Sequence, residues 1–239
     1  KLTPTEVDAD AVQQALKFFL QINEVRQHPA SAHLPLGSEA CFTLDEHAEC
    51  LRRRVARLQQ VVADNPLNAE ASRLIRDELQ PTSARVLQHF ASATRAAGLE
   101  LQQQLATADR CISPSDFGFH NALRDESGKI RFLDFEYAGW DDPGKMVADF
   151  FCQPEIPAPV ALFDEFATAV AERLSNPAQQ RQRFHLLWPL YRLKWCCIML
   201  NDFLPTDSRR RLFARSDSEE ERQVRQLAKA KQALALVQI

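Results

Sequence analysis

The chain has 239 residues, of which 45% are hydrophobic and 26% charged, and its formal net charge is −3 at pH 7. This is the composition of an ordinary globular protein that can bury a sizeable core. The nearly balanced charge gives no overall attraction to nucleic acid or to an anionic membrane, and no apolar run reaches membrane-spanning length. We therefore expect a cytoplasmic protein whose partners include neither nucleic acid nor a membrane.

The cysteines and glycines exclude several familiar kinds of site. The six cysteines show no CxxC spacing, and the adjacent pair Cys196 and Cys197 is poorly suited to zinc. A chain of this length can build a core without disulfides, so we expect buried, reduced thiols. The six glycines are scattered, and neither GxGxxG nor GxxxxGK[ST] occurs, so the usual backbone cradle for phosphates is missing.

Helical periodicity dominates the chain on both sides of its centre. The spacing of apolar residues predicts helices at about 8–26, 43–63, 68–79, 82–97, 99–107, 145–152, 160–174 and 178–203, with one more near the C-terminus. Pro81 is expected to separate two of these helices, because it lacks a backbone donor. Strand-like sequence is confined to about 110–135, and residues 137–143 have the composition of a turn. The predicted architecture is a helical bundle carrying one small β-ribbon.

The most informative stretch is residues 111–136. Two apolar runs flank the polar hinge 125–129, which predicts a β-hairpin. Asp116, Asn121 and Asp134 lie at the ends of these runs, so the hairpin would bring two carboxylates and a carboxamide together. Such hard oxygen ligands suit Mg²⁺, which usually shares substrate phosphates. The alternative is that the first two side chains cap turns and the third ends a strand.

The segments SPSDFGFHNAL and KIRFLDFEYAGWDDPGKMVADFF resemble the catalytic and metal segments of the aminoglycoside phosphotransferase and choline kinase superfamily. That family has an H-G-D-x4-N motif and then I-D-[WFY]-E, commonly followed by G-D-P…D. The resemblance implies that Asp116 is the catalytic residue that meets the acceptor hydroxyl. It implies that Asn121 and Asp134 hold Mg²⁺ and, through it, the ATP cofactor. For His120 we expect a structural role.

The same resemblance assigns supporting roles further along the chain. Glu136 matches the glutamate that follows the metal aspartate, and Asp142-Pro143 and Asp149 match the segment that supports the loop. In this family the C-terminal lobe builds most of the acceptor pocket. Residues that could line that pocket or support its loops are therefore Glu136, Tyr137, Trp140, Asp141 and Asp149.

The implied fold class is mainly α: the helical C-terminal lobe of a protein-kinase-like (α+β) phosphotransferase, with a small β-hairpin that carries the catalytic and metal loops. Residues 1–239 would form this single lobe, and residues 1–8 would be the linker from an N-terminal nucleotide-binding β-lobe. That lobe of the same protein is absent from the chain and is an expected partner. One departure from the family is that Pro114 and Ser115 replace the His-Gly before the catalytic Asp.

The resulting hypothesis is an ATP- and Mg²⁺-dependent phosphotransferase that phosphorylates a hydroxyl of a small molecule, such as a sugar, an aminoglycoside or an amino-alcohol. The alternative is a non-catalytic pseudokinase or binding module that keeps the fold, which the departure at Pro114 and Ser115 and the absent lobe would favour. The fragment by itself is expected to be inactive. The identity of the acceptor and the oligomeric state stay open.

Overall fold

The computed structural model describes residues 1–205 and 218–237, which form two compact units. The first unit comprises residues 1–46 and 100–187, and the described residues of the second are 47–99, 188–205 and 218–237. Helices α2 (Leu44–Arg57) and α7 (Pro177–Leu200) each contribute residues to both units. That the two units act as one lobe stays a prediction.

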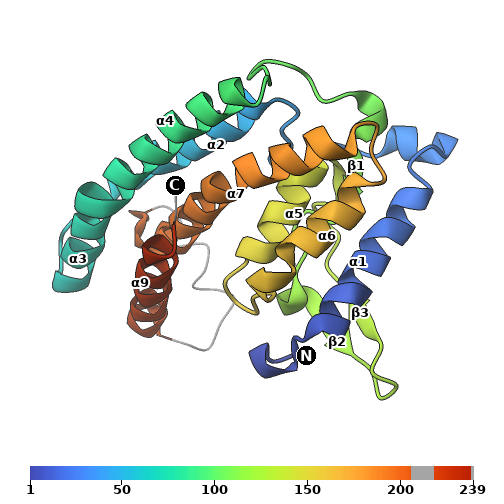
Figure 1. The fold of residues 1–239 in the computed structure, drawn as a ribbon. Coiled ribbons are helices and arrows are strands. Elements are labelled where there is room, and N and C mark those ends of the chain that lie inside the picture. Colours follow the sequence, from blue (N-terminus) through green and yellow to red (C-terminus); the bar gives the residue numbers. More distant parts are fainter. Residues whose placement is uncertain (206–217, 238–239) are drawn as a thin grey trace. The chain divides into compact units, whose positions relative to one another are not determined.

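The first unit contains four short strands and three further helices (Figure 1). In chain order these are α1 (Ala9–Glu24), β1 (Cys111–Ser113), β2 (Ala122–Arg124), β3 (Ile130–Phe132), β4 (Gly139–Asp141), α5 (Pro143–Cys152) and α6 (Phe163–Ala171). Helix α1 packs against α6, β1 and β3, and α5 packs against α6 and β1. The described part of the chain is therefore mainly α with small β-ribbons, as the sequence predicted.

The predicted hairpin is formed by β2 and β3. They pair antiparallel, with Ala122 opposite Phe132. The carboxylate of Asp125 accepts hydrogen bonds from the backbone N–H groups of Ser127 and Lys129, each at 3.0 Å, and so stabilises the turn. Gln14 on α1 covers the outer edge of β3: its side chain accepts from the N–H of Ile130 at 2.8 Å and donates to a carbonyl in the turn.

A second ribbon, β1 paired with β4, was not predicted. Its register places Ser113 opposite Gly139, although residues 137–143 had been expected to form a turn. The segment around Leu36 adds a parallel bridge to β4 at Trp140. A Cβ atom on Gly139 would clash with the carbonyl oxygen of Pro35 and lie 2.7 Å from the nitrogen of Gly37. The close approach of this segment therefore requires glycine in β4.

Aromatic side chains form the core beneath the hairpin. Phe150 on α5 stacks on Phe117 at a centroid distance of 4.9 Å and on Phe166 at 5.1 Å, and it lies 5.4 Å from Phe119. Phe132 on β3 packs against Phe117 at 4.8 Å. Each such pair contributes about 0.5–1.5 kcal/mol beyond its buried area. Because Phe117 and Phe119 belong to the loop between β1 and β2, this core fixes the position of that loop.

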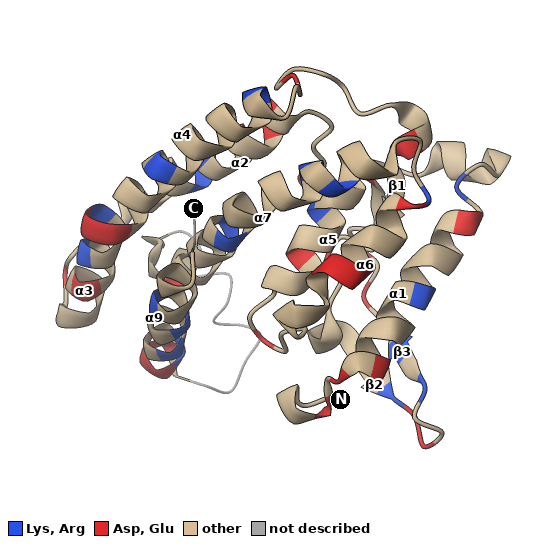
Figure 2. Cartoon of the chain, viewed as in Figure 1, with Lys and Arg blue, Asp and Glu red and all other residues tan. Residues whose placement is uncertain are grey.

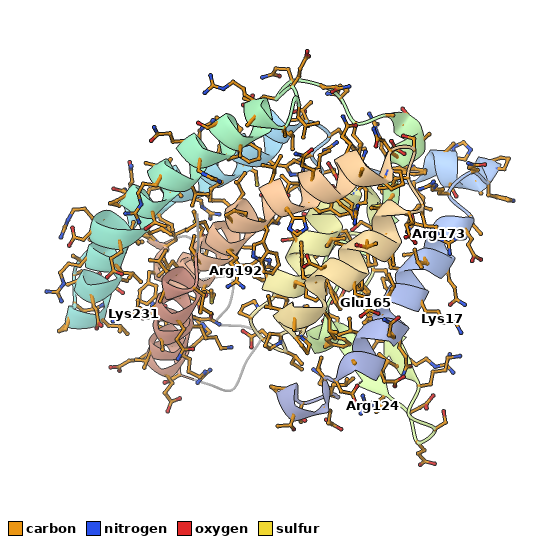
Figure 3. The ribbon with its side chains drawn as sticks, viewed as in Figure 1. Lys17, Arg124, Glu165, Arg173, Arg192 and Lys231 are labelled. Carbon is orange, nitrogen blue, oxygen red and sulfur yellow. The ribbon has the colours of Figure 1, made fainter. Side chains whose placement is uncertain are left out.

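All regular secondary structure in the described part of the second unit is helical. Besides its shares of α2 and α7, it contains α3 (Pro66–Leu74), a π-helical turn (Ile75–Leu79), α4 (Gln80–Ala96) and α9 (Glu219–Ala235). Helix α9 has three glutamates in its first turn, where its macrodipole favours acids, and basic residues further along (Figure 2). Lys231 on α9, labelled in Figure 3, pairs with Glu70 on α3. None of the helices in residues 1–205 and 218–237 is long and apolar enough to cross a membrane.

Two helix predictions were wrong. Pro81 does not separate two helices, because it lies in the first turn of α4, directly after the π-helical turn. There the N–H of Gln80 bonds to the carbonyl of Ile75, and this wider turn lets the helix continue. Residues 99–107 do not form the predicted helix. Their backbone groups bond elsewhere instead: Leu105 donates to Phe42 at 2.7 Å, and Leu101 accepts from Asp45 at 3.0 Å.

Candidate active site

Two of the predicted site residues, Asp116 and Asn121, are in contact at the open end of the β2–β3 hairpin. The side-chain Nδ2 of Asn121 lies 3.2 Å from the Oδ2 of Asp116 and 3.1 Å from its backbone carbonyl. The N–H of Leu133 donates to the carbonyl of Asn121 at 2.9 Å, which continues the ladder beyond the strands. Asp134 follows immediately. Asp116 and Asn121 are thus in contact at one end of the ribbon, and the backbone of Asp134 lies next to them in the hairpin register.

Both loops that carry these residues contain a strained backbone position. Ser115 has a φ of 70° and Asp134 a φ of 64°, in the left-handed region that residues other than glycine rarely adopt. The N–H of Ser115 bonds to the hydroxyl of Ser113 at 3.0 Å, which holds the first loop in place. Strain of this kind costs on the order of 1–3 kcal/mol and is concentrated at functional sites in proteins.

The pKa of Tyr137 is shifted by the acidic side chains around it. A hydrogen bond with Glu136 raises the pKa of Tyr137 above its usual value, and the negative charges of Glu136, Asp134 and Asp116 raise it further. Tyr137 is itself exposed, with 54% of its surface accessible. The rim of the site therefore combines an accessible aromatic ring with several acids.

Beneath the site lies a buried network of charges. Lys145 Nζ is 2.5 Å from Asp141 and 3.8 Å from Asp149, and Arg183 on α7 is 2.5 Å from Asp142. Burial alone would lower the pKa of Lys145, but the charges of Asp141 and Asp149 outweigh it and raise that pKa above the ordinary value. Asp142 also caps α5, because its side chain accepts from the N–H of Gly144 at 2.7 Å.

Burial and hydrogen bonding limit the roles that Asp141 and Trp140 can have. Asp141 is fully buried and paired with Lys145, so its geometry suits loop support and gives it no surface for an acceptor. Trp140 donates its indole N–H to the carbonyl of Ser31 at 3.0 Å and so anchors a neighbouring turn. Sequence reasoning did not single out Lys145 or Arg183. The i,i+4 spacing of Asp141 and Lys145 was a detectable signal, whereas nothing linked Arg183 to Asp142, 41 residues away.

The donor chemistry of the site fits Mg²⁺. Because the Nδ2 of Asn121 faces Asp116, its Oδ1 points away from that carboxylate, and the carboxylate of Asp134 is exposed. In residues 1–205 and 218–237 no three His, Cys, Asp or Glu side chains converge as a metal site would require. One amide and one carboxylate form a smaller donor set, which Mg²⁺ typically completes with water and substrate phosphates.

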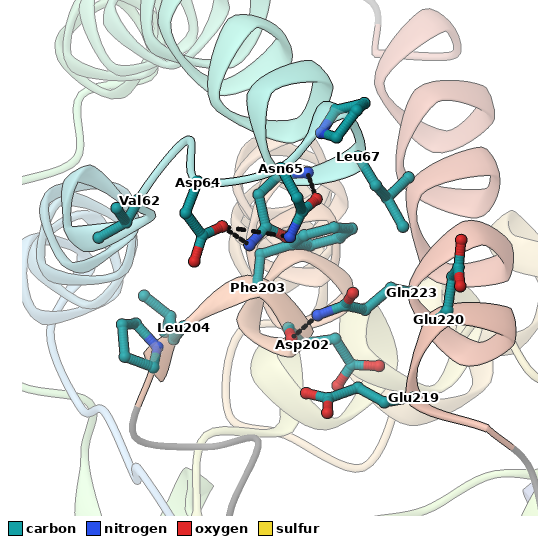
Figure 4. A pocket seen from close by; sticks show the side chains of 13 residues that line it. Val62, Asp64, Asn65, Leu67, Asp202, Phe203, Leu204, Glu219, Glu220 and Gln223 are labelled. Carbon is teal, nitrogen blue, oxygen red and sulfur yellow. Dashed lines mark hydrogen bonds between the residues drawn. The ribbon is translucent and has the colours of Figure 1, made fainter.

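A cavity of about 640 Å³ in the second unit also has an acidic lining, and it contains none of the predicted residues (Figure 4). Its carboxylates have structural roles. Asp64 accepts from the side chains of Asn65 and Asn68, and Asp202 pairs with a buried arginine of α9. Its two glutamates lie in the first turn of α9, where the helix dipole favours acids. We therefore assign no site to it.

The described part of the chain has a mainly α fold, and comparison with solved structures shows that this fold is similar to that of a choline kinase. A choline kinase from Cryptosporidium parvum Iowa II matches with a TM-score of 0.51 and 12% identity, over 98% of this chain and 68% of the other. At this identity the likeness establishes the fold alone.

Two further structures give weaker matches. An ethanolamine kinase from Plasmodium vivax has a TM-score of 0.48 and 10% identity, over 96% of this chain and 61% of the other. A choline/ethanolamine kinase family protein from Mesorhizobium loti has a TM-score of 0.38 and 18% identity, over 84% and 72% of the two chains. No protein-family model and no curated protein sequence matches this chain.

Proposed function

We propose that this chain is the catalytic and acceptor-binding lobe of a phosphotransferase that uses ATP and Mg²⁺ to phosphorylate a hydroxyl group of a small molecule. The observation that carries the proposal is the contact between Asp116 and Asn121 at one end of the hairpin, with Asp134 directly after the residue that pairs with Asn121. Phosphoryl transfer needs little covalent chemistry from a protein, so positioned carboxylates and a metal supply most of the catalysis. The proposal includes a nucleotide-covering lobe in the same protein, as the family resemblance implies.

In this mechanism Asp116 is the base. Its side chain is 46% exposed, so an acceptor hydroxyl can approach it. Asp116 accepts the proton of that hydroxyl while the acceptor oxygen bonds to the γ-phosphorus of ATP and the bond to the leaving ADP oxygen breaks. The Oδ1 of Asn121 and the carboxylate of Asp134 would hold Mg²⁺. When bound, the metal neutralises charge on the phosphates.

The acceptor class we propose is a cationic amino-alcohol. Glu136 forms a hydrogen bond with the exposed Tyr137, and this pairing of a carboxylate with an aromatic ring suits an ammonium group. The structural neighbour with the same fold is a choline kinase, which agrees with this choice. Sugars and aminoglycosides are the competing acceptors.

The alternative is a non-catalytic module that keeps the fold. Pro114 and Ser115 favour it, because they replace the family's His-Gly before the base. The positive φ angles of Ser115 and Asp134 favour the enzyme, since a scaffold without a site gains nothing from that strain. Both readings predict the same fold, so activity has to decide between them.

The deciding experiment is an assay of ADP release by the full-length protein with choline, ethanolamine, several sugars and an aminoglycoside as acceptors. We expect turnover with an amino-alcohol and a loss of about 10²–10⁴-fold in kcat for Asp116→Asn. Asp125→Asn is the matched control: the residue lies in the turn of the same hairpin and keeps its hydrogen-bond acceptor. Turnover by Asp116→Asn equal to the wild type would exclude Asp116 as the base. No turnover with any acceptor would favour the scaffold.

A further inference from the structure

We propose that His120 is a positioning residue that holds the carboxylate of Asp116 in the orientation needed for proton transfer. This inference rests on the proposed function of Asp116 and gives His120 more than the structural role expected from the sequence. The supporting observations are the contacts of His120 with Asp116 and Gly118, and that of Asn121 with Asp116.

The two oxygens of the Asp116 carboxylate have different neighbours. The Nε2 of His120 lies 3.2 Å from Oδ1, and the Nδ2 of Asn121 lies 3.2 Å from Oδ2. A rotation of the carboxylate would lengthen both contacts at once, so these two neighbours help to hold its plane. The side chain stays 46% exposed, and the face that an acceptor can reach is therefore held in one orientation.

His120 is itself held in place. Its side chain is only 18% exposed and lies in the 3-10 turn Phe119–Asn121, between the buried ring of Phe119 and the start of β2. The imidazole packs on Gly118, where an added Cβ would be 2.7 Å from Nδ1 and 3.0 Å from Cε1. Gly118 has an extended backbone with a φ of 176°, so the space taken by the imidazole, and not the backbone angle, requires glycine there.

The surroundings of the ring also select its tautomer. Nε2 faces a carboxylate, which accepts hydrogen bonds and does not donate them. Nδ1 of His120 is buried and has no hydrogen-bond partner. With the proton on Nε2, the ring can donate to the Asp116 carboxylate, and only the lone pair of Nδ1 is buried without a partner. With the proton on Nδ1, a donor would be buried without an acceptor, and Nε2 could not donate to Asp116. The geometry therefore assigns the proton of the neutral ring to Nε2.

The first test separates kcat from KM in the full-length protein. Because a displacement of about 1 Å can cost 10²-fold in rate, we expect His120→Ala to lower kcat by about 10–100-fold with little change in KM. His120→Gln keeps a donor near the position of Nε2 and should recover most of that loss. His185 is the matched control, since it forms an exposed pair with Asp164 at 3.3 Å in the same unit, and His185→Ala should leave kcat unchanged.

A second variant moves the ring without removing any functional group. Gly118→Ala places a methyl group against Nδ1 and so displaces the imidazole from its present position beside Asp116. It should reproduce the kcat loss of His120→Ala, and the double variant should lose little more than either single one. Wild-type kcat in folded His120→Ala, with turnover abolished in Asp116→Asn, would overturn the positioning role and leave the proposed function intact.

A third measurement does not depend on activity. Histidine ¹H–¹⁵N correlation spectra of the full-length protein should show His120 with its proton on Nε2, and Asp116→Asn should shift that signal while His185 stays unchanged. A proton on Nδ1, or a His120 signal that does not shift in Asp116→Asn, would overturn the inference even if no acceptor is turned over. Turnover that survives Asp116→Asn would instead remove the proposed function, and with it the role of His120.

Discussion

The N–H of Leu133 donates to the carbonyl of Asn121 at 2.9 Å, and this one bond fixes where Asp134 lies relative to Asn121. It continues the β2–β3 register past the last strand residue, Phe132. A slip of one residue would turn every side chain of β3 to the opposite face. The proposed metal ligands therefore depend on the register of the hairpin as much as on their own chemistry.

The first prediction concerns Asp134. Asparagine and glycine both tolerate its φ of 64°, so Asp134→Asn and Asp134→Gly remove the charge without forcing the loop to rearrange. We expect Mg²⁺-dependent ATP binding by the full-length protein to weaken at least 10-fold in both variants, measured by calorimetry. The melting temperature should be unchanged for Asn and equal or higher for Gly.

Asp134→Ala provides the contrast. Alanine lacks the local polar contacts that help Asp and Asn adopt a left-handed backbone, so it should lose stability as well as nucleotide binding. Unchanged ATP binding in Asp134→Asn would remove this residue from the proposed metal site. A drop in the melting temperature of Asp134→Gly would contradict the reading of position 134 as strained.

The second prediction concerns the segment that crosses β4. Gly139→Ala should lower the free energy of unfolding by about 1–3 kcal/mol, because its methyl group would clash with the carbonyl of Pro35. Gly37→Ala is the matched control in the same segment, since its nearest neighbour would be Asp141 Oδ2 at 3.4 Å, an ordinary contact. Urea unfolding of both variants checks the pair, and equal losses would count against the close approach.

The third prediction compares two lysines. Lys145→Met removes the cation that is buried against Asp141, and we expect the free energy of unfolding to fall by about 3–5 kcal/mol. Lys231→Met is the same substitution in a pair whose lysine side chain is 46% exposed, and it should cost less than about 1 kcal/mol. Similar losses in urea unfolding would contradict the importance of the buried network.

The same lysine gives a prediction for pH. The pKa of Lys145 is raised in the folded protein, so its contribution to stability is complete below the ordinary value of 10.5. Above 10.5 the unfolded chain loses this proton while the folded protein keeps it, and stability falls as the pH rises toward the folded pKa. In the Lys145→Met variant this part of the alkaline decline should be missing. If the difference in free energy of unfolding between the wild type and Lys145→Met stays constant from pH 9 to pH 12, this prediction is wrong.

The fourth prediction concerns the thiols. All six cysteines lie in the described part of the chain, none forms a disulfide, and five are buried. Burial raises the pKa of Cys196 to about 12, and it raises the pKa of Cys111 as well, so neither forms a thiolate at neutral pH. We expect a maleimide to label Cys152 in the folded protein and all six in urea, read by mass spectrometry. Rapid native labelling of Cys196 would contradict the packing of α7.

Local sequence signals predicted the hairpin well. Asp125 to Lys129 is a polar turn between two apolar runs, and the turn is stabilised by hydrogen bonds within those five residues. Once the hairpin forms, its register places Leu133 opposite Asn121 and Asp134 directly after it. The candidate site could be found from sequence because its geometry is set by interactions between near neighbours.

The second ribbon and the region after Gly98 could not be predicted in this way. Gly98 ends α4 with a φ of 68°, as a helix stop should, but the next residues bond to Phe42 and Asp45, which are more than fifty positions away. Likewise β4 exists because it pairs with β1 and with the segment around Leu36. The β1–β4 ribbon and the residues after Gly98 both depend on backbone pairing between distant parts of the chain. The sequence of a short segment does not indicate such pairing.

The side chain of Gln14 has a consequence for the behaviour of the protein in solution. A two-stranded ribbon leaves an open edge, and open edges can pair with those of other molecules and start aggregation. By bonding to the N–H of Ile130 and to the carbonyl of Gly128, Gln14 occupies part of the β3 edge with an amide from α1. One glutamine on a helix thus helps to keep the hairpin that carries the site from recruiting a second copy of itself.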